Sequence, residues 1–176
     1  IEFCLEHYFA ECLSAENPVL AMLEQVVDST ALMIAQWQAE GLCHGVMNTD
    51  NMSILCLTID YGPFGFLDDY KPAHICNHSD YYGRYAYNQQ PAVGLWNLQR
   101  LAQALSDYVP SAQSEPLWMR YQQRINQHYQ QLMLDKLGLT QWRSEDEALL
   151  AGLFQLMAEQ GVDYQQSLRA LRFVEC

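Results

Sequence analysis

The chain has 176 residues, 50% of them hydrophobic, and a formal net charge of -12 with an isoelectric point near 4.6. A chain of this length buries roughly two-thirds of its unfolded surface on folding, so one sizeable core is expected. Its nine basic residues are few and scattered, which excludes sequence-independent binding to nucleic acid. The sequence has no run of about 18 apolar residues, so neither a membrane span nor a signal peptide is predicted.

Six cysteines are spread along the chain without the close pairs of a zinc site or the density of a disulfide scaffold. They are Cys4, Cys12, Cys43, Cys56, Cys76 and Cys176. Free cysteine is among the most buried residue types, so most of them are expected to be buried thiols in a reducing compartment.

The amino-terminal part of the chain predicts two helices. The first covers residues 2–13 and ends near Asn17-Pro18, because proline disfavours helical geometry in the residue before it. The second begins there and runs to Glu40, with apolar residues at helical spacing and Gly41 as its terminator.

The middle of the chain lacks helical periodicity. Residues 42–52, which are rich in Asn, Asp and Thr, are expected to form a loop. Residues 53–59 predict two short strands around a tight turn near Cys56, and residues 60–80 predict an ordered loop. The hairpin would bring together the acidic and amide residues that lie before and after it.

After Pro91 the chain is predicted to be nearly all helical. Residues 144–147 have the pattern of a capping box, and a last helix is expected over residues 163–173. The fold class is therefore predicted to be mainly α with a small β-hairpin. The apolar stripes at helical spacing end at Pro110, Gly138 and Gly161.

Asp50, Asn51 and Asp60 carry the strongest chemical signal of the sequence. Carboxylate and amide oxygens that converge on one point are the ligands that hold Mg²⁺ against the phosphates of a substrate. His44, which begins the same loop, is expected to brace it through backbone hydrogen bonds. The sequence therefore predicts a metal–phosphate site at this loop.

Several blocks of the chain resemble the selenoprotein O family, pseudokinases that act as protein adenylyltransferases. A small-molecule kinase would have a carboxylate residue directly after Gly45, but this chain has Val46 there. A carboxylate residue instead precedes Asn51, at Asp50. The family usually has glycine where Cys56 stands, so a turn that needs a positive φ would be strained at this departure. The resembling blocks are His44–Asn51, Thr58–Asp68, Ile75–Asp80, Gly83–Tyr85 and Gln90–Ala102.

This resemblance implies the carboxyl-terminal lobe of a protein-kinase-like fold, with residues 1–109 as its core and residues 110–176 as a helical extension packed on it. It implies transfer of AMP from ATP to Ser, Thr or Tyr hydroxyls of proteins, with Mg²⁺ or Mn²⁺. Asp50 would accept the proton of the attacking hydroxyl. Asn51 and Asp60 would hold the metal, and through it Asp60 would bind the nucleotide. The location would be the cytoplasm of a bacterium or the mitochondrion of a eukaryote.

Two alternatives stay open. One is an ordinary kinase-like phosphotransferase, against which Val46 argues, and the other is a non-catalytic pseudokinase scaffold, which would have no need of a metal site. A glycine-rich phosphate loop and a strand-borne lysine are missing from the sequence. Together with the start at Ile1, this indicates a piece of a longer protein that is inactive alone.

Overall fold

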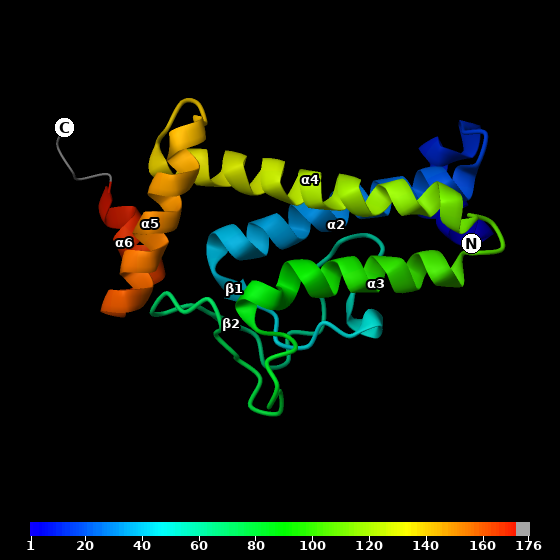
Figure 1. Cartoon of the computed structure of the whole chain (residues 1–176). Helices are drawn as coiled ribbons and strands as arrows, with labels where there is room; N and C mark the ends of the chain where they lie inside the picture. Colours follow the sequence, from blue (N-terminus) through cyan, green and yellow to red (C-terminus); the bar gives the residue numbers. More distant parts are fainter. Residues whose placement is uncertain (172–176) are drawn as a thin grey trace.

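The computed structural model describes residues 1–171 and is mainly helical, with one small antiparallel pair of strands, as predicted (Figure 1). The predicted last helix extends to Phe173, which lies outside the described residues, as does Cys176. Short helices of the 3-10 type are labelled η. The elements are α1 (Glu2–Tyr8), η1 (Ala10–Ser14), α2 (Pro18–Glu40), β1 (Leu42–Cys43), η2 (Thr49–Asn51), β2 (Gly65–Phe66), η3 (Tyr87–Gln89), α3 (Gln90–Ala104), α4 (Ser111–Leu137), α5 (Ser144–Gln160) and α6 (Tyr164–Ala170).

Helix α2 is central to the fold, because α3 and α4 both pack along it (Figure 1). Its ends are those predicted. The side chain of Asn17 accepts a hydrogen bond from the N–H of Leu20 at 3.1 Å, and Gly41 adopts a left-handed conformation with φ of +69°. By length and composition α2 could span a membrane, but core helices meet the same criteria, and 56% of this apolar stretch is buried.

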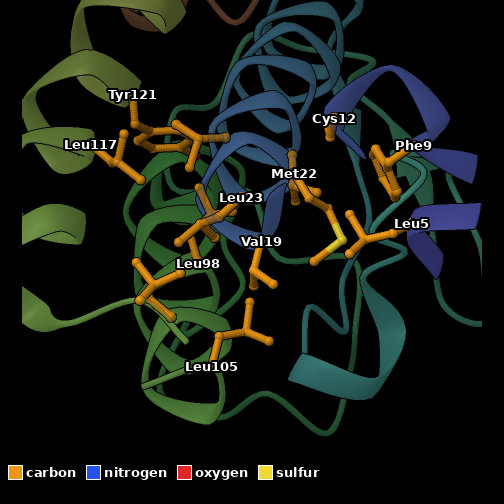
Figure 2. Close-up of a cluster of buried hydrophobic side chains, with 14 of the residues drawn as sticks. Leu5, Phe9, Cys12, Val19, Met22, Leu23, Leu98, Leu105, Leu117 and Tyr121 are labelled. Atoms are coloured by element: carbon orange, nitrogen blue, oxygen red, sulfur yellow. The ribbon is translucent and has the colours of Figure 1, made fainter. Parts of the chain in front are cut away.

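One core cluster fills the space between α1, α2, α3 and α4 (Figure 2). Each large side chain that is buried in it stabilises the fold by about 1.5–3 kcal/mol. The cluster therefore holds the helix that leads into the predicted site, α2, against α3. Its labelled members are Leu5, Phe9, Cys12, Val19, Met22, Leu23, Leu98, Leu105, Leu117 and Tyr121.

The prediction of one continuous helix over residues 2–13 is wrong, since the structure has two short helices there, α1 and η1. The chain leaves the α-helix at Phe9, where φ is -136°. The Phe9 ring is buried in the cluster of Figure 2. Burial of such a ring stabilises the fold more than one further helical hydrogen bond does, so packing overrides the local helical preference.

The capping box predicted at α5 is displaced by one residue. The helix begins at Ser144, so Arg143 occupies the N-cap position, and its N–H donates to the carboxylate of Asp146 at 2.7 Å. The Ser144 hydroxyl donates to Glu145 instead of capping the helix. Asp146 therefore takes the role that was expected of Glu147, whose carboxylate would accept from the backbone N–H of the N-cap residue.

The strand pair lies at a different place from the predicted hairpin. β1 and β2 pair antiparallel, whereas residues 53–59 contain no strand. The pair joins the two ends of the long segment 44–64, so it brings the start and the end of this segment together. The paired residues are Leu42 with Phe66 and Cys43 with Gly65.

Residues 53–59 turn rather than pair. The N–H of Cys56 donates to the carbonyl oxygen of Ser53 at 2.9 Å, and the Ser53 hydroxyl accepts from the N–H of Leu55 at 3.1 Å. Cys56 has a φ of +54°, a left-handed conformation that is strained for a residue with a Cβ. The predicted strain at Cys56 is thus confirmed. Its sulfur lies 3.4 Å from Thr30 Oγ1 on α2, which holds the turn against the helix.

An ion pair between Asp28 and Arg120 joins α2 to α4. Arg120 binds both carboxylate oxygens of Asp28, with its Nε donating to Oδ1 at 2.8 Å. Arg124 Nε lies 3.4 Å from the same Oδ1. Partial burial acts to raise the pKa of the Asp28 carboxyl, but the hydrogen bond and charge of Arg120 outweigh it, so the pKa is lowered.

We expect Asp28→Asn to lower the free energy of unfolding by about 1 kcal/mol at neutral pH. The folded-state pKa of the Asp28 carboxyl is lowered. The ion pair therefore stabilises the fold fully above the unfolded-state pKa of about 4, and this stabilisation is lost as the pH falls through the folded-state pKa. Urea unfolding at about pH 7 and about pH 3 measures the difference, with Asp135→Asn, an exposed position on α4, as control. A penalty of equal size at both pH values would contradict the ion-pair explanation.

Candidate active site

His44 is buried at the start of the loop that it was predicted to brace. Its Nε2 lies 2.7 Å from the carbonyl oxygen of Ile59, and its Nδ1 lies 3.4 Å from the N–H of Val46. A ring that donates from Nε2 and accepts at Nδ1 satisfies both contacts. The ring also packs on Trp37 of α2, with centroids 5.3 Å apart. The bracing role is confirmed, since His44 holds Ile59 against its own loop.

Asp50 and Asn51 lie in η2. The side-chain Nδ2 of Asn51 donates to the carbonyl oxygen of Val46 at 3.1 Å, and its N–H donates to the carbonyl oxygen of Asn48 at 3.0 Å. Because the amide nitrogen is engaged, the amide oxygen of Asn51 is available as a ligand. The Tyr85 hydroxyl donates to the Asn48 side chain, which anchors the start of η2. Asp50 itself is exposed at the surface.

Asp60 directly follows Ile59, the residue that His44 holds. It is exposed and has a φ of +57°, a conformation that few residues other than glycine adopt. Its carbonyl oxygen accepts from the N–H of Gly62 at 2.7 Å in a tight turn. A strained backbone at an acidic residue is the kind of outlier that clusters at functional sites.

Hydrogen bonds tie Asn51, and the residue before Asp60, to one three-residue stretch, His44 to Val46. Asn51 is bonded to Val46, and Ile59, the neighbour of Asp60, is bonded to His44. An amide oxygen and a carboxylate suit Mg²⁺ or Mn²⁺, which prefer oxygen ligands. Nowhere in the described part of the chain do three or more His, Cys, Asp or Glu side chains form a metal-binding group. The predicted ligand pair thus offers one carboxylate and one amide.

Helix α3 anchors the same loop through two buried amides, Gln90 and Asn97. Gln90 Oε1 accepts from the N–H of His44 at 2.9 Å, and its Nε2 donates to the carbonyl oxygen of Leu42 at 2.8 Å. Asn97 Nδ2 donates to the carbonyl oxygen of Met47 at 3.0 Å. The two amides are two helical turns apart and so lie on one face of α3. They fix the backbone on both sides of His44.

Gln90 and Asn97 were not among the predicted site residues. The signal in the sequence was that both are polar yet fall at helical spacing with the apolar Val93 and Leu98. A polar residue on a buried helix face needs a hydrogen-bond partner. In this protein the partners are the backbone groups of the loop.

We expect Gln90→Leu to lower the free energy of unfolding by about 2–5 kcal/mol. The reason is that the N–H of His44 and the carbonyl group of Leu42 would both stay buried without a partner. Gln103→Leu, at an exposed position of the same helix, is the matched control and should change the stability by less than about 0.5 kcal/mol. Urea unfolding measures both variants, and equal losses would show that Gln90 does not anchor the loop.

A second segment closes on the loop from the residues after β2. Asn77 Nδ2 donates to the carbonyl oxygen of Gly45 at 3.1 Å, and Cys76 Sγ lies 3.3 Å from the carbonyl oxygen of Cys43. The Cys76 thiol also acts as a hydrogen-bond donor toward the Cys43 side chain, and this lowers the pKa of the Cys43 thiol although burial acts to raise it. Gly45 has a φ of +82°, and a Cβ at this position would lie 2.6 Å from Cys76 Sγ. Only glycine therefore fits between His44 and Val46.

Relatives match nearly all of the chain. It is 51% identical over 171 residues to "Protein nucleotidyltransferase YdiU" of Aliivibrio fischeri, 54% identical over 167 residues to that of Vibrio vulnificus and 53% identical over 171 residues to that of Aeromonas salmonicida. These matches cover 97%, 95% and 97% of the chain but 35%, 34% and 35% of the relatives. The chain thus spans about a third of the length of these bacterial proteins, whose class is that of protein nucleotidyltransferases.

The sequence model of one family, protein adenylyltransferase SelO, matches residues 1–175. The chain belongs to this family, as the blocks from His44 to Ala102 predicted. The match also includes the helices after residue 109, which those blocks do not cover.

Proposed function

We propose that the full-length protein transfers AMP from ATP to Ser, Thr or Tyr hydroxyls of other proteins, and that this chain supplies the base and the metal ligands. Asp50 accepts the proton of the attacking hydroxyl. Asn51 and Asp60 hold Mg²⁺ or Mn²⁺, which supplies charge neutralisation at the nucleotide phosphates. The observation that carries the proposal is the anchoring of Asn51 and of Ile59, next to Asp60, to the stretch from His44 to Val46.

The arrangement around the loop supports a kinase-like carboxyl-terminal lobe as the setting of this site. A long buried helix, α2, leads into the loop, a histidine braces the loop, and α3 anchors its backbone. We propose that this lobe is inactive alone. No glycine-rich phosphate loop or strand-borne lysine is found in its sequence, so the groups that hold most of the triphosphate belong to the rest of the protein.

The exposure of Asp50 supports its proposed role as the base. Because the side chain is exposed, a hydroxyl of a protein substrate can approach it, and its neighbour Asn51 is bonded to Val46. When the hydroxyl oxygen attacks the α-phosphorus of ATP, its proton goes to Asp50, the bond to the β-phosphate breaks and pyrophosphate leaves. Val46 occupies the place of the usual kinase base and offers no carboxylate, which disfavours ordinary phosphotransfer.

The experiment that tests the proposal follows the label from ATP into protein. We expect the full-length protein with Mg²⁺ or Mn²⁺ to transfer label from the α-phosphate and none from the γ-phosphate, and mass spectrometry to find AMP on a hydroxyl residue. Transfer from the γ-phosphate would show an ordinary kinase. Metal-dependent nucleotide binding without transfer of either label would show a non-catalytic scaffold.

A further inference from the structure

Residues 80–85 form a turn that one carboxylate holds closed. The side chain of Asp80 accepts from the N–H of Arg84 at 2.9 Å and from the N–H of Tyr85 at 2.8 Å. The N–H of Gly83 donates to the carbonyl oxygen of Asp80 at 3.2 Å, and Gly83 has a left-handed φ of +66°. Asp80 thus satisfies two backbone groups and fixes the point at which Tyr85 leaves the turn.

The Tyr85 ring is held in place by packing as well. It lies against the core cluster that contains Trp37 and Met47, and the Arg84 guanidinium lies 5.6 Å from its ring centroid. The carbonyl oxygen of Tyr85 accepts from the Cys43 thiol at 3.5 Å. Because the ring is already ordered by these contacts, its hydroxyl orders a partner at little further cost in entropy.

The partner of this hydroxyl lies at the start of the helical turn that carries the proposed base. The Tyr85 hydroxyl donates to the side-chain oxygen of Asn48, two residues before Asp50. The carbonyl oxygen of Asn48 accepts from the N–H of Asn51 at 3.0 Å, so Asn48 closes the single turn of η2. The Asp50 side chain is exposed, so packing does not fix it and its direction depends on the backbone of η2.

We propose that Tyr85 is a positioning residue for the base. Through Asn48, its hydroxyl holds η2 in the orientation that presents Asp50 to the attacking hydroxyl, and Tyr85 itself takes no proton. The inference rests on the proposed function, since it takes Asp50 as the base. A misplacement of about 1 Å can lower a rate about 10²-fold, so one hydrogen bond that orients this turn is enough to affect the reaction.

The first test compares rates of label transfer by the full-length protein. Tyr85→Phe keeps the ring and removes the hydroxyl, and we expect it to lower kcat by about threefold to thirtyfold. Asn48→Ala should cause a similar loss, and the double variant should lose at most about twofold more, because both changes remove the same bond. Tyr82→Phe removes a hydroxyl from a side chain that is 98% exposed, and this matched control should stay within about twofold of the unaltered protein.

The Asp50→Ala background separates positioning of the base from a general structural effect. If Tyr85 acts through Asp50, Tyr85→Phe should lower the residual rate of Asp50→Ala by less than about twofold. A hydroxyl with a merely structural role would lower the rate by the same factor in both backgrounds. That result, or additive losses for Tyr85→Phe and Asn48→Ala, would overturn the proposal while leaving the transfer of AMP intact.

Amide hydrogen exchange of the same full-length proteins needs no activity. We expect a peptide that contains η2 to exchange about threefold to tenfold faster in Tyr85→Phe, and at an unchanged rate in Tyr82→Phe. Unchanged exchange in Tyr85→Phe would overturn this inference whether or not any label is transferred. Transfer of γ-phosphate label alone would instead contradict the proposed function, and the comparison of rates would then be made with that label.

Discussion

Replacing Asp50 with alanine is expected to lower the rate of AMP transfer by the full-length protein about 10²–10⁴-fold, the usual effect of losing a general base. The side chain is exposed, so its removal should change the free energy of unfolding by less than about 0.5 kcal/mol. Asp50→Asn should cause a similar loss, because the amide keeps the shape of the side chain but cannot accept the proton. Transfer of α-phosphate label to protein measures the rate.

The control for this experiment is Asp107→Ala, which removes an exposed carboxylate from the turn after α3. We expect its rate to stay within about twofold of the unaltered protein. If Asp50→Ala retained a rate close to that of Asp107→Ala, then Asp50 would not be the base. Loss of activity in both variants would indicate a general effect of charge instead.

Replacing Gly94 with alanine is expected to destabilise the protein by about 1–3 kcal/mol through overpacking. Gly94 lies on α3 and faces Tyr121 of α4, and an added Cβ would clash with the Tyr121 hydroxyl oxygen and lie 3.4 Å from a carbon of Ile34. Tyr121 is 1% exposed and its hydroxyl donates to the carbonyl oxygen of Pro91. The ring must therefore shift, and this hydrogen bond is weakened.

Gly152→Ala is the matched control, because it makes the same substitution inside another helix. An added Cβ at Gly152, on the exposed side of α5, has no atom within 4 Å. We expect this variant to be more stable by about 0.5–1 kcal/mol, since alanine favours the helix over glycine. Thermal unfolding followed by circular dichroism should show opposite shifts of Tm, each about 2–4 °C per kcal/mol. Shifts of the same sign would contradict the close packing at Gly94.

The sequence alone was enough to predict the helices after residue 17 and most of their ends. The signals are local: Asn17 bonds within the first turn of α2, and Gly41, Gly138 and Gly161 supply the left-handed residue after α2, α4 and α5. Each depends on residues a few positions apart in the chain, so no tertiary contact is needed to recognise it. The division of the chain at residue 109 stays a prediction.

The motifs of the sequence also predicted the family, which the match over residues 1–175 confirms. They identified Asp50, Asn51 and Asp60 as candidate site residues, and the roles of these three residues stay proposals. The bracing role of His44 is confirmed by its contacts with Ile59 and Val46. Polar residue types at a set spacing were the signal, and this signal does not depend on the route that the backbone takes between them.

Only the tertiary structure decided how the loop is held. Residues 53–59 were predicted to form two short strands, yet the strands form at 42–43 and 65–66, and the loop bonds to Gln90 and Asn97 of α3. A loop residue has no partner at a fixed distance along the chain, because its backbone groups bond to whichever buried group packing brings near. Those partners lie more than forty residues away, where their spacing in the sequence carries no sign of the contact.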